Sequence, residues 1–190
     1  MSIGEKTKST HPKVIVVATS HLLELLHVDL MGPTRTESIG GKRYIIVVVD
    51  DFPRYSWVEF LREKSEACNK MERLCKKLQN EKGVPIVKIR SDHGKEFENA
   101  KFEAFCNKHG IKKEFSNPKT PQQNRVFERK NQVIQEMARV MILNKNIPQK
   151  FWAEVENTLC HFGNRIFFWA QTKKTSYEIW REKKPKVKYF

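Results

Sequence analysis

Four aspartates occur in the 190 residues, and two of them stand where strands are expected to end. Asp29 lies within or at the end of the first expected strand, and Asp92 directly follows the fourth. Aspartate is disfavoured in strands, so both positions need a reason beyond secondary structure. Asp50 and Asp51 instead end the second strand and open a turn, where aspartate is an ordinary residue. Asp29 and Asp92 are therefore the aspartates most suited to chemistry.

The elements that position these residues follow from the apolar pattern of the chain. Apolar and β-branched runs predict strands at 25–30, 44–49, 55–61, 85–90 and 111–115. Helical periodicity and cap residues predict helices at 65–80, at 100–109, from Pro121 after the cap residue Thr120, and at 149–168. The first three strands form an antiparallel meander, and the strand–helix–strand connections after them imply a parallel extension. The expected fold class is α/β, with a five-stranded mixed sheet of order 3-2-1-4-5 flanked by helices.

In that order the first and fourth strands are neighbours. The carboxylates of Asp29 and Asp92 then lie close together, where like charges repel unless a cation joins them. Carboxylate oxygens clustered in this way suit Mg²⁺ or Mn²⁺. The sequence therefore predicts a divalent-metal site where these two strands end.

Glu128 is the third acidic candidate, in the second turn of the helix that begins at Pro121. The polar stripe of that helix contains Glu128, Asn131, Gln132, Gln135 and Arg139. The opposite, apolar arc contains Val126, Val133, Ile134, Met137, Ala138 and Met141. A glutamate on a polar helix face is ordinarily solvated. The pattern becomes specific only when the three acids are taken together, with 35 residues between Asp92 and Glu128.

Several ordered segments around these acids resemble one known family. They are 27–33 (HVDLMGP), 40–44 leading into 49–51, 90–97 (RSDHGKEF), 120–124 followed by 128–131 (TPQQN and ERKN), and 151–154 (FWAE). With their spacing, these segments resemble the D,D-35-E integrase cores of copia-type retrotransposons, from about residue 20 to the end. That resemblance implies a ribonuclease-H-like fold, which is shared with retroviral integrases and many transposases.

The resemblance also implies a reaction. Asp29, Asp92 and Glu128 would hold Mg²⁺ or Mn²⁺, with two ions in the site, and catalyse phosphoryl transfer in the end-processing and strand transfer of retrotransposon DNA. The implied partners are the retrotransposon ends, a target duplex and further copies of the chain as a homo-oligomer. The implied place of action is the nucleus, after synthesis in the cytoplasm. No membrane partner and no small-molecule substrate is expected.

The charge of the chain favours a nucleic-acid partner. The formal net charge is +14 and the pI is ≈ 9.7, and Lys and Arg gain affinity for polyanions by releasing counterions condensed on phosphates. The residues expected to contact DNA are Lys95, Lys119, Arg125, Arg129, Lys130, Asn131, Gln132 and Gln135. For each basic residue taken singly, a solvated surface role is about as common. His27 and His93, which flank the two aspartates, fit supporting or surface roles better than metal ligation.

The remaining composition excludes other kinds of site. Four cysteines without CxxC spacing indicate neither a zinc centre nor a disulfide framework. Neither a signal peptide nor an apolar run of about 18 residues is present. The expected organisation is an irregular lead-in at 1–20, which in the family would follow a zinc-binding segment missing here, then a catalytic core at 21–170 and a basic linker at 171–190.

Three residues depart from the family pattern. Arg125 replaces a usual glycine, Pro53 replaces a common serine, and Gln132 replaces a frequent basic residue. These changes leave the three acids intact but predict impaired catalysis by this copy. Two alternatives therefore stay open: a catalytically decayed nucleic-acid-binding remnant of a retrotransposon polyprotein, and a hydrolytic nuclease on the same fold.

Overall fold

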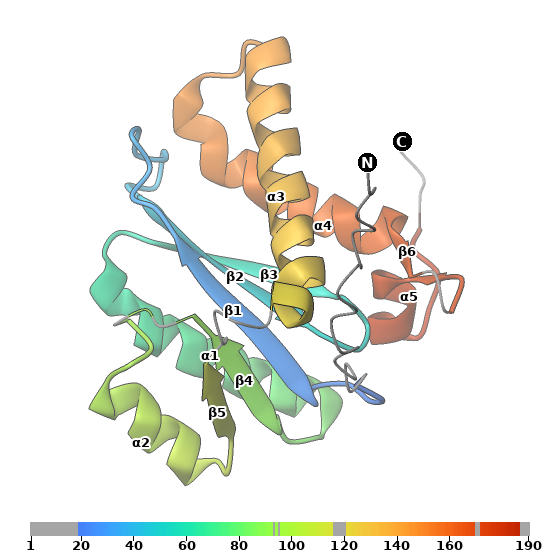
Figure 1. Cartoon of the computed structure of the whole chain (residues 1–190). Coiled ribbons are helices and arrows are strands. Elements are labelled where there is room, and N and C mark those ends of the chain that lie inside the picture. Colours follow the sequence, from blue (N-terminus) through green and yellow to red (C-terminus); the bar gives the residue numbers. More distant parts are fainter. Residues whose placement is uncertain (1–18, 93, 95, 116–120, 170–171, 187–190) are drawn as a thin grey trace, which may run out of the picture.

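A computed structural model describes the backbone of residues 19–92, 94, 96–115, 121–169 and 172–186, and the side chains of all of these except 121–128 and 169. At its centre is a sheet of the strands β1 Leu25–Met31, β2 Tyr44–Asp50, β3 Ser56–Leu61, β4 Lys88–Ser91 and β5 Lys112–Phe115. Their order is β3-β2-β1-β4-β5 (Figure 1). β1 to β3 pair antiparallel, and β4 extends the sheet parallel to β1 and β5. The predicted mixed sheet is confirmed.

The helices of the described chain follow the strands as expected. They are α1 Ala67–Lys82, α2 Ala100–Lys108, α3 Pro121–Asn144, α4 Trp152–Ile166 and α5 Ser176–Arg181. α1 ends at Gly83, whose φ of 67° is favourable for a residue without a Cβ. α2 begins after Asn99, whose side chain accepts a hydrogen bond from the Phe102 amide. The predicted cap of α3, Thr120, lies outside the described residues. None of the helices in the described ranges is long and apolar enough to cross a membrane.

One face of the sheet is covered by α1 and α2 and closed by apolar side chains. Alternate residues of β1 and β2, such as Leu26 and Val48, point to this face because side chains alternate along a strand. They belong to one cluster with Met71 of α1 and Phe102 of α2, all buried. The four cysteines of the chain are free and buried.

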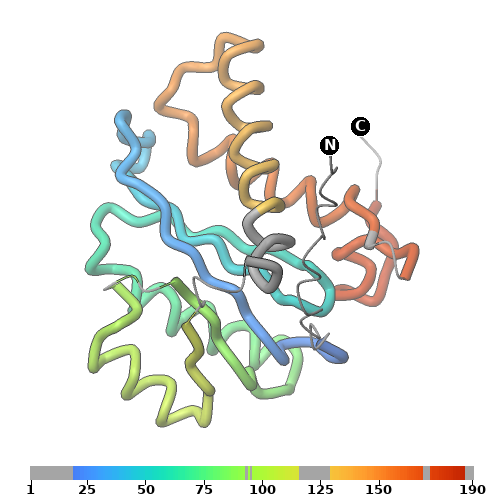
Figure 2. The backbone as a smooth tube through the Cα atoms, in the orientation of Figure 1, coloured from blue at the N-terminus to red at the C-terminus, as the bar shows by residue number. Residues whose placement is uncertain are grey.

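The opposite face is covered by α3 and α4, which form a helical hairpin (Figure 2). Ile45 and Val49 of β2 point to this face and pack against Trp152 of α4. A separate small cluster that includes Ile134 and Leu159 joins the two helices to each other. The hairpin continues past the edge of the sheet (Figure 1), and its outer part contacts the loop after β1.

The apolar arc predicted for α3 is partly wrong. Ile134 and Ala138 are buried as expected, but Val133 and Met141 are exposed, and Asn131 of the predicted polar stripe is buried. The buried side of α3 is set by its contacts with β1 and α4, where the side-chain amide of Asn131 donates to Asp29.

The chain after α4 folds back onto the domain. α4 ends at Ile166, before the predicted end at 168, because Phe167 is extended. The short strands β6 Phe168–Trp169 and β7 Lys174–Thr175 pair antiparallel and lead into α5. Trp180 of α5 is 0% exposed in the main core, and its ring centroid lies 4.8 Å from that of Trp57. The segment predicted as a linker therefore contributes part of the core.

Candidate active site

β1 and β4 bring two of the three predicted acids to the same level of the sheet. The strands are parallel, with Val28 opposite Ser91, and Asp29 and Asp92 each follow directly after this pair. Asp29 is half-buried, whereas Asp92 is exposed, and Oδ1 of Asp92 accepts a hydrogen bond from the Gly94 amide at 3.3 Å. The predicted pairing of the first and fourth strands is confirmed. That the two carboxylates meet stays a prediction.

α3 lies along β1 and contacts it through side chains with matching spacing. Nδ2 of Asn131 donates to Oδ2 of Asp29 at 3.3 Å, and Nε2 of Gln135 donates to Sδ of Met31. Four helical residues advance about 6 Å and two strand residues about 6.6 Å, so both pairs meet when helix and strand run in the same direction. These contacts fix the position of α3 along the strand that carries Asp29.

Glu128 lies in α3 three residues before Asn131, a spacing that puts two residues on neighbouring parts of one helix face. Its side chain is outside the described residues, so the three-acid site stays a prediction. Among the side chains that the structure describes, no group of three or more His, Cys, Asp or Glu residues could hold a metal ion.

A buried polar cluster behind Asp29 joins β1 to the turn after β2. His27 is 2% exposed, and its Nε2 lies 3.0 Å from Oδ1 of Asp51, which also pairs with Nη1 of Arg54 at 2.9 Å. Burial alone raises the pKa of Asp51, but the His27 hydrogen bond and the Arg54 charge outweigh it and lower that pKa to about 2. Burial lowers the pKa of His27, against the opposing effect of Asp51. His27 therefore contacts Asp51 within this buried cluster, and its supporting role stays a prediction, whereas His93 lies outside the described residues.

Lys130 joins α3 to the same turn. Its ammonium donates to the carbonyl oxygen of Arg54, and burial lowers its pKa to about 8. Within the described ranges, no carboxylate forms an ion pair with this lysine. The sequence suggested Lys130 only as a DNA contact, because a lysine on a helix surface does not reveal that its amine reaches a backbone carbonyl of a distant turn.

The other residues predicted to contact DNA divide into three groups. Arg129 and Gln132 are exposed on the outer side of α3. Asn131 and Gln135 instead turn toward β1. The residues that lie outside the description, wholly or in their side chains, are Lys95, Lys119 and Arg125. DNA contact by any of these residues stays a prediction.

The donor atoms near Asp29 suit a divalent cation. Oδ1 of Asn131 is buried and has no hydrogen-bond partner in the described part of the chain. Buried polar atoms are normally satisfied, so an orphaned oxygen next to a carboxylate marks a place where water or an ion completes the contacts. Carboxylate and amide oxygens are the donors that Mg²⁺ prefers. Asp29, Asp92 and their surroundings therefore fit the predicted metal.

Comparison with known proteins decides the family. Residues 20–121, more than half of the chain, match the family model described as integrase core domain. The chain belongs to this family. The matched region contains Asp29 and Asp92 and ends before Glu128, so the assignment of this integrase core does not depend on the third acid.

The curated relatives of this integrase core are retrotransposon polyproteins. Over 145 residues it is 36% identical to the retrovirus-related Pol polyprotein from transposon TNT 1-94 of Nicotiana tabacum, in an alignment that covers 76% of this chain and 11% of the relative. The chain thus spans about a tenth of the length of the curated relatives it matches. The resemblance to retrotransposon integrases is confirmed.

Solved structures of retroviral integrases share the fold. The HTLV-2 integrase catalytic core domain in complex with magnesium (trimeric form) has a TM-score of 0.60 at 20% identity, covering 83% of this chain and 95% of that one. A chain of the simian T-cell lymphotropic virus intasome in complex with PP2A regulatory subunit B56 gamma has a TM-score of 0.70 at 16% identity, covering 97% of this chain and 63% of that one. The expected ribonuclease-H-like fold is confirmed.

Proposed function

We propose that this chain is the catalytic core of a retrotransposon integrase, a divalent-metal-dependent polynucleotidyl transferase that processes DNA ends and joins them to a target duplex. The observation that carries the proposal is the parallel pairing of β1 with β4, because Asp29 and Asp92 follow directly after the paired residues Val28 and Ser91, and the helix that contains Glu128 contacts Asp29. Membership of the integrase core family supports it. We place the catalytic core at 21–170, with α5 packed onto it.

Asp29, Asp92 and Glu128 would hold two Mg²⁺ or Mn²⁺ ions, a proposal supported by the magnesium named for the HTLV-2 neighbour. When bound, such ions activate the attacking oxygen, from water or a DNA 3′-hydroxyl, and stabilise the leaving oxygen at phosphorus. Asn131 orients the carboxylate of Asp29 through its hydrogen bond. Lys130 holds this part of α3 against the turn after β2.

DNA is the proposed partner of the outer side of α3. Arg129 and Gln132 are exposed there, and the net charge of +14 favours phosphate contacts. One structural neighbour is described as an intasome and another as a trimeric form, which supports DNA ends and further copies of the chain as partners. We expect the reaction to occur in the nucleus, where the target duplex lies.

The test is joining of a labelled oligonucleotide end to a target duplex with Mg²⁺, Mn²⁺ or a chelator. We expect joined product only with metal. Asp92→Asn and Glu128→Gln should each reduce it below detection, while Glu103→Gln, on the exposed side of α2, should leave it unchanged. Cleavage without joining would replace the proposal by a hydrolytic nuclease. Binding without cleavage or joining would replace it by a decayed remnant.

Arg125 and Gln132 bear on the rate of this copy. Arg125 stands three residues before Glu128, where an arginine can pair with the glutamate and compete with the metal. Arg125→Gly combined with Gln132→Arg should raise joining, and the glycine should cost up to about 1 kcal/mol of unfolding free energy. Equal joining by the double variant and the parent would contradict a local impairment.

A further inference from the structure

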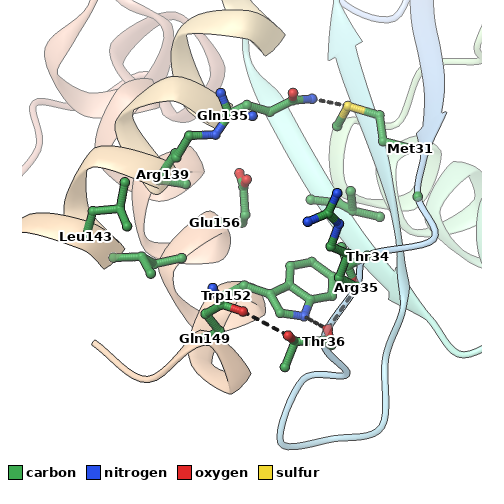
Figure 3. Close-up of a pocket in the computed structure, with 14 residues that line it drawn as sticks. Met31, Thr34, Arg35, Thr36, Gln135, Arg139, Leu143, Gln149, Trp152 and Glu156 are labelled. Carbon is green, nitrogen blue, oxygen red and sulfur yellow. Dashed lines mark hydrogen bonds between the residues drawn. The ribbon is translucent and has the colours of Figure 1, made fainter. Parts of the chain in front are cut away.

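A groove of about 440 Å³ lies between the α3–α4 hairpin and the loop after β1, a volume in the range of small-ligand sites (Figure 3). Its apolar surface comes from Met31, Ile45, Ala138, Ile142, Leu143 and Trp152. Its polar lining comes from Thr34, Arg35, Thr36, Gln135, Arg139, Gln149 and Glu156. Met31 and Gln135, which join β1 to α3, also form one end of the groove.

The loop side and the helix side of the groove are joined by hydrogen bonds (Figure 3). The indole Nε1 of Trp152 donates to the carbonyl oxygen of Thr36 at 3.0 Å, and Oγ1 of Thr36 donates to Oε1 of Gln149 at 2.9 Å. Trp152 is 8% exposed and held from two sides, because it also packs on the sheet. The groove is therefore built on fixed side chains.

Glu156 is the unusual residue of this groove. Its carboxylate is half-buried and directed into the space between the helices and the loop (Figure 3). Burial raises its pKa to about 7, and no other described residue contributes to the shift. Its neighbours one turn away on α4, at 152, 153, 159 and 160, are all uncharged. No ion pair or hydrogen bond from another described residue reaches it.

Neither of the two arginines that line the groove forms an ion pair with the Glu156 carboxylate. Arg139 pairs with Glu136 at 3.2 Å, on the exposed side of α3. Arg35 lines the groove but forms no ion pair within the described chain. A carboxylate withdrawn from water without a cation is destabilised, and a ligand that supplies the cation removes that cost.

We propose that this groove binds an organic cation, an ammonium or guanidinium group on an apolar stem, with the charge at Glu156 and the stem along Trp152 and Ile142. This site is separate from the proposed reaction, because none of the three acids proposed to hold the metal, Asp29, Asp92 and Glu128, is among its described lining residues. A free amine and a lysine or arginine side chain of a partner protein present the same chemistry.

The test uses 2-phenylethylamine as the probe, with 2-phenylethanol and 3-phenylpropionate as the neutral and anionic analogues. Binding is followed by the shift of the Trp152 indole N–H resonance in ¹⁵N-labelled chain, assigned with Trp152→Phe. We expect the amine to bind at least about tenfold more tightly than either analogue at pH 8, because only the cation forms an ion pair with the ionised Glu156 carboxylate.

Two further measurements test whether Glu156 is the carboxylate that binds the amine. Glu156→Gln keeps the shape of the side chain and should remove the preference for the amine, while Glu154→Gln, exposed on the same helix, should retain it. In the parent, affinity should fall about tenfold from pH 8 to pH 6, as Glu156 becomes protonated and the lining residues Arg35 and Arg139 stay charged.

A second probe, the acetylated dipeptide amide of leucine and lysine, distinguishes the two sources of the cation, a free amine and a side chain of a partner protein. Tighter binding than the free amine supports a protein side chain as the natural ligand, and weaker binding supports a free amine. Equal affinity for the amine and its neutral analogue, or an unchanged preference in Glu156→Gln, would overturn the proposal. Because none of these measurements involves DNA, they stand apart from the joining reaction.

Discussion

The face of the sheet under α1 and α2 is closed by apolar side chains, whereas the face under α3 and α4 carries polar contacts and a groove. On the first face even the late segment α5 adds Trp180 to the core. On the second, Asp29 and Asp51 have polar partners, while Glu156 has none among the described residues. Opposite effects on pKa follow, to about 2 for Asp51 and about 7 for Glu156. One face is thus closed by apolar packing, and the other is the face on which we propose the chemistry and the binding.

The largest effect on stability is expected on the apolar face, at Trp180. Trp180→Ala should lower the free energy of unfolding by about 3–5 kcal/mol, because a fully buried indole leaves a cavity beside Tyr55 and Trp57. Phe168→Ala is the matched control, since that ring is 71% exposed, and it should cost less than about 1 kcal/mol. Chemical denaturation measures both. A loss below 1 kcal/mol for Trp180→Ala would contradict the contribution of α5 to the core and support the predicted linker.

A pH effect is expected at Asp50, at the end of β2. Asp50 is 0% exposed and accepts from the Leu23 amide at 2.8 Å, and burial raises its pKa to about 7. Between pH 5 and 7 the unfolded chain has lost this proton while the folded chain keeps it. The contribution of Asp50 to stability must therefore fall as pH rises, by about 1.4 kcal/mol for each pH unit at most.

The difference in unfolding free energy between the parent and Asp50→Asn isolates this carboxyl, because His27 titrates in both. Measured from pH 5 to pH 8, that difference should shift against the parent up to about pH 7 and then level off. A difference independent of pH would show that Asp50 is ionised in the folded chain throughout.

On the polar face, Asn131 should affect activity more than stability. Asn131→Leu removes the donor to Asp29 and should reduce joining by at least about tenfold, since a misplaced catalytic group loses much of its effect. Its cost in unfolding free energy should stay within about 1–3 kcal/mol. Asn144→Leu, exposed at the end of the same helix, is the control. Equal losses of activity and folded fraction in Asn131→Leu would assign Asn131 a structural role only.

The smallest effect is expected for DNA affinity at the exposed cations of α3. With about four to six phosphate contacts, log K against log salt should have a slope of roughly −4 to −5. Arg129→Gln with Arg139→Gln should reduce the slope by about 2, while Lys76→Gln with Lys77→Gln, exposed on α1 over the other face, should not. A larger change of the slope for the α1 pair would indicate that DNA contacts the side of the molecule covered by α1.

The sequence predicted the sheet because its signals are local. The continuous apolar run of β2 and the glycine after α1 each specify one element, and the strand–helix–strand connections then determine the order. The pairing of Asp29 with Asp92 followed from that order. The hairpin of β6 and β7 escaped prediction because strands of two residues have no periodicity to detect.

Features that depend on packing between distant segments were not predictable. A basic, polar tail gave no indication that Trp180 would fill the core, and Lys130 gave none that it would reach the Arg54 carbonyl. Nothing in the sequence of α4 distinguishes Glu156 from the other glutamate of that helix, Glu154. Only the packing of α3 beside α4 and the loop after β1 withdraws it from water.

The central claim, a metal site shared by Asp29, Asp92 and Glu128, is tested most directly by Mn²⁺ titration of the ¹⁵N-labelled chain. Substoichiometric Mn²⁺ broadens resonances near its site, so we expect the amides at 29, 92 and 128 and the side-chain amide of Asn131 to disappear first. The indole N–H of Trp180, on the other face, should persist. Asp92→Asn should abolish the local broadening and Glu103→Gln should preserve it. Broadening centred elsewhere, or amides around 128 that remain sharp while those at 29 and 92 vanish, would contradict the three-acid site.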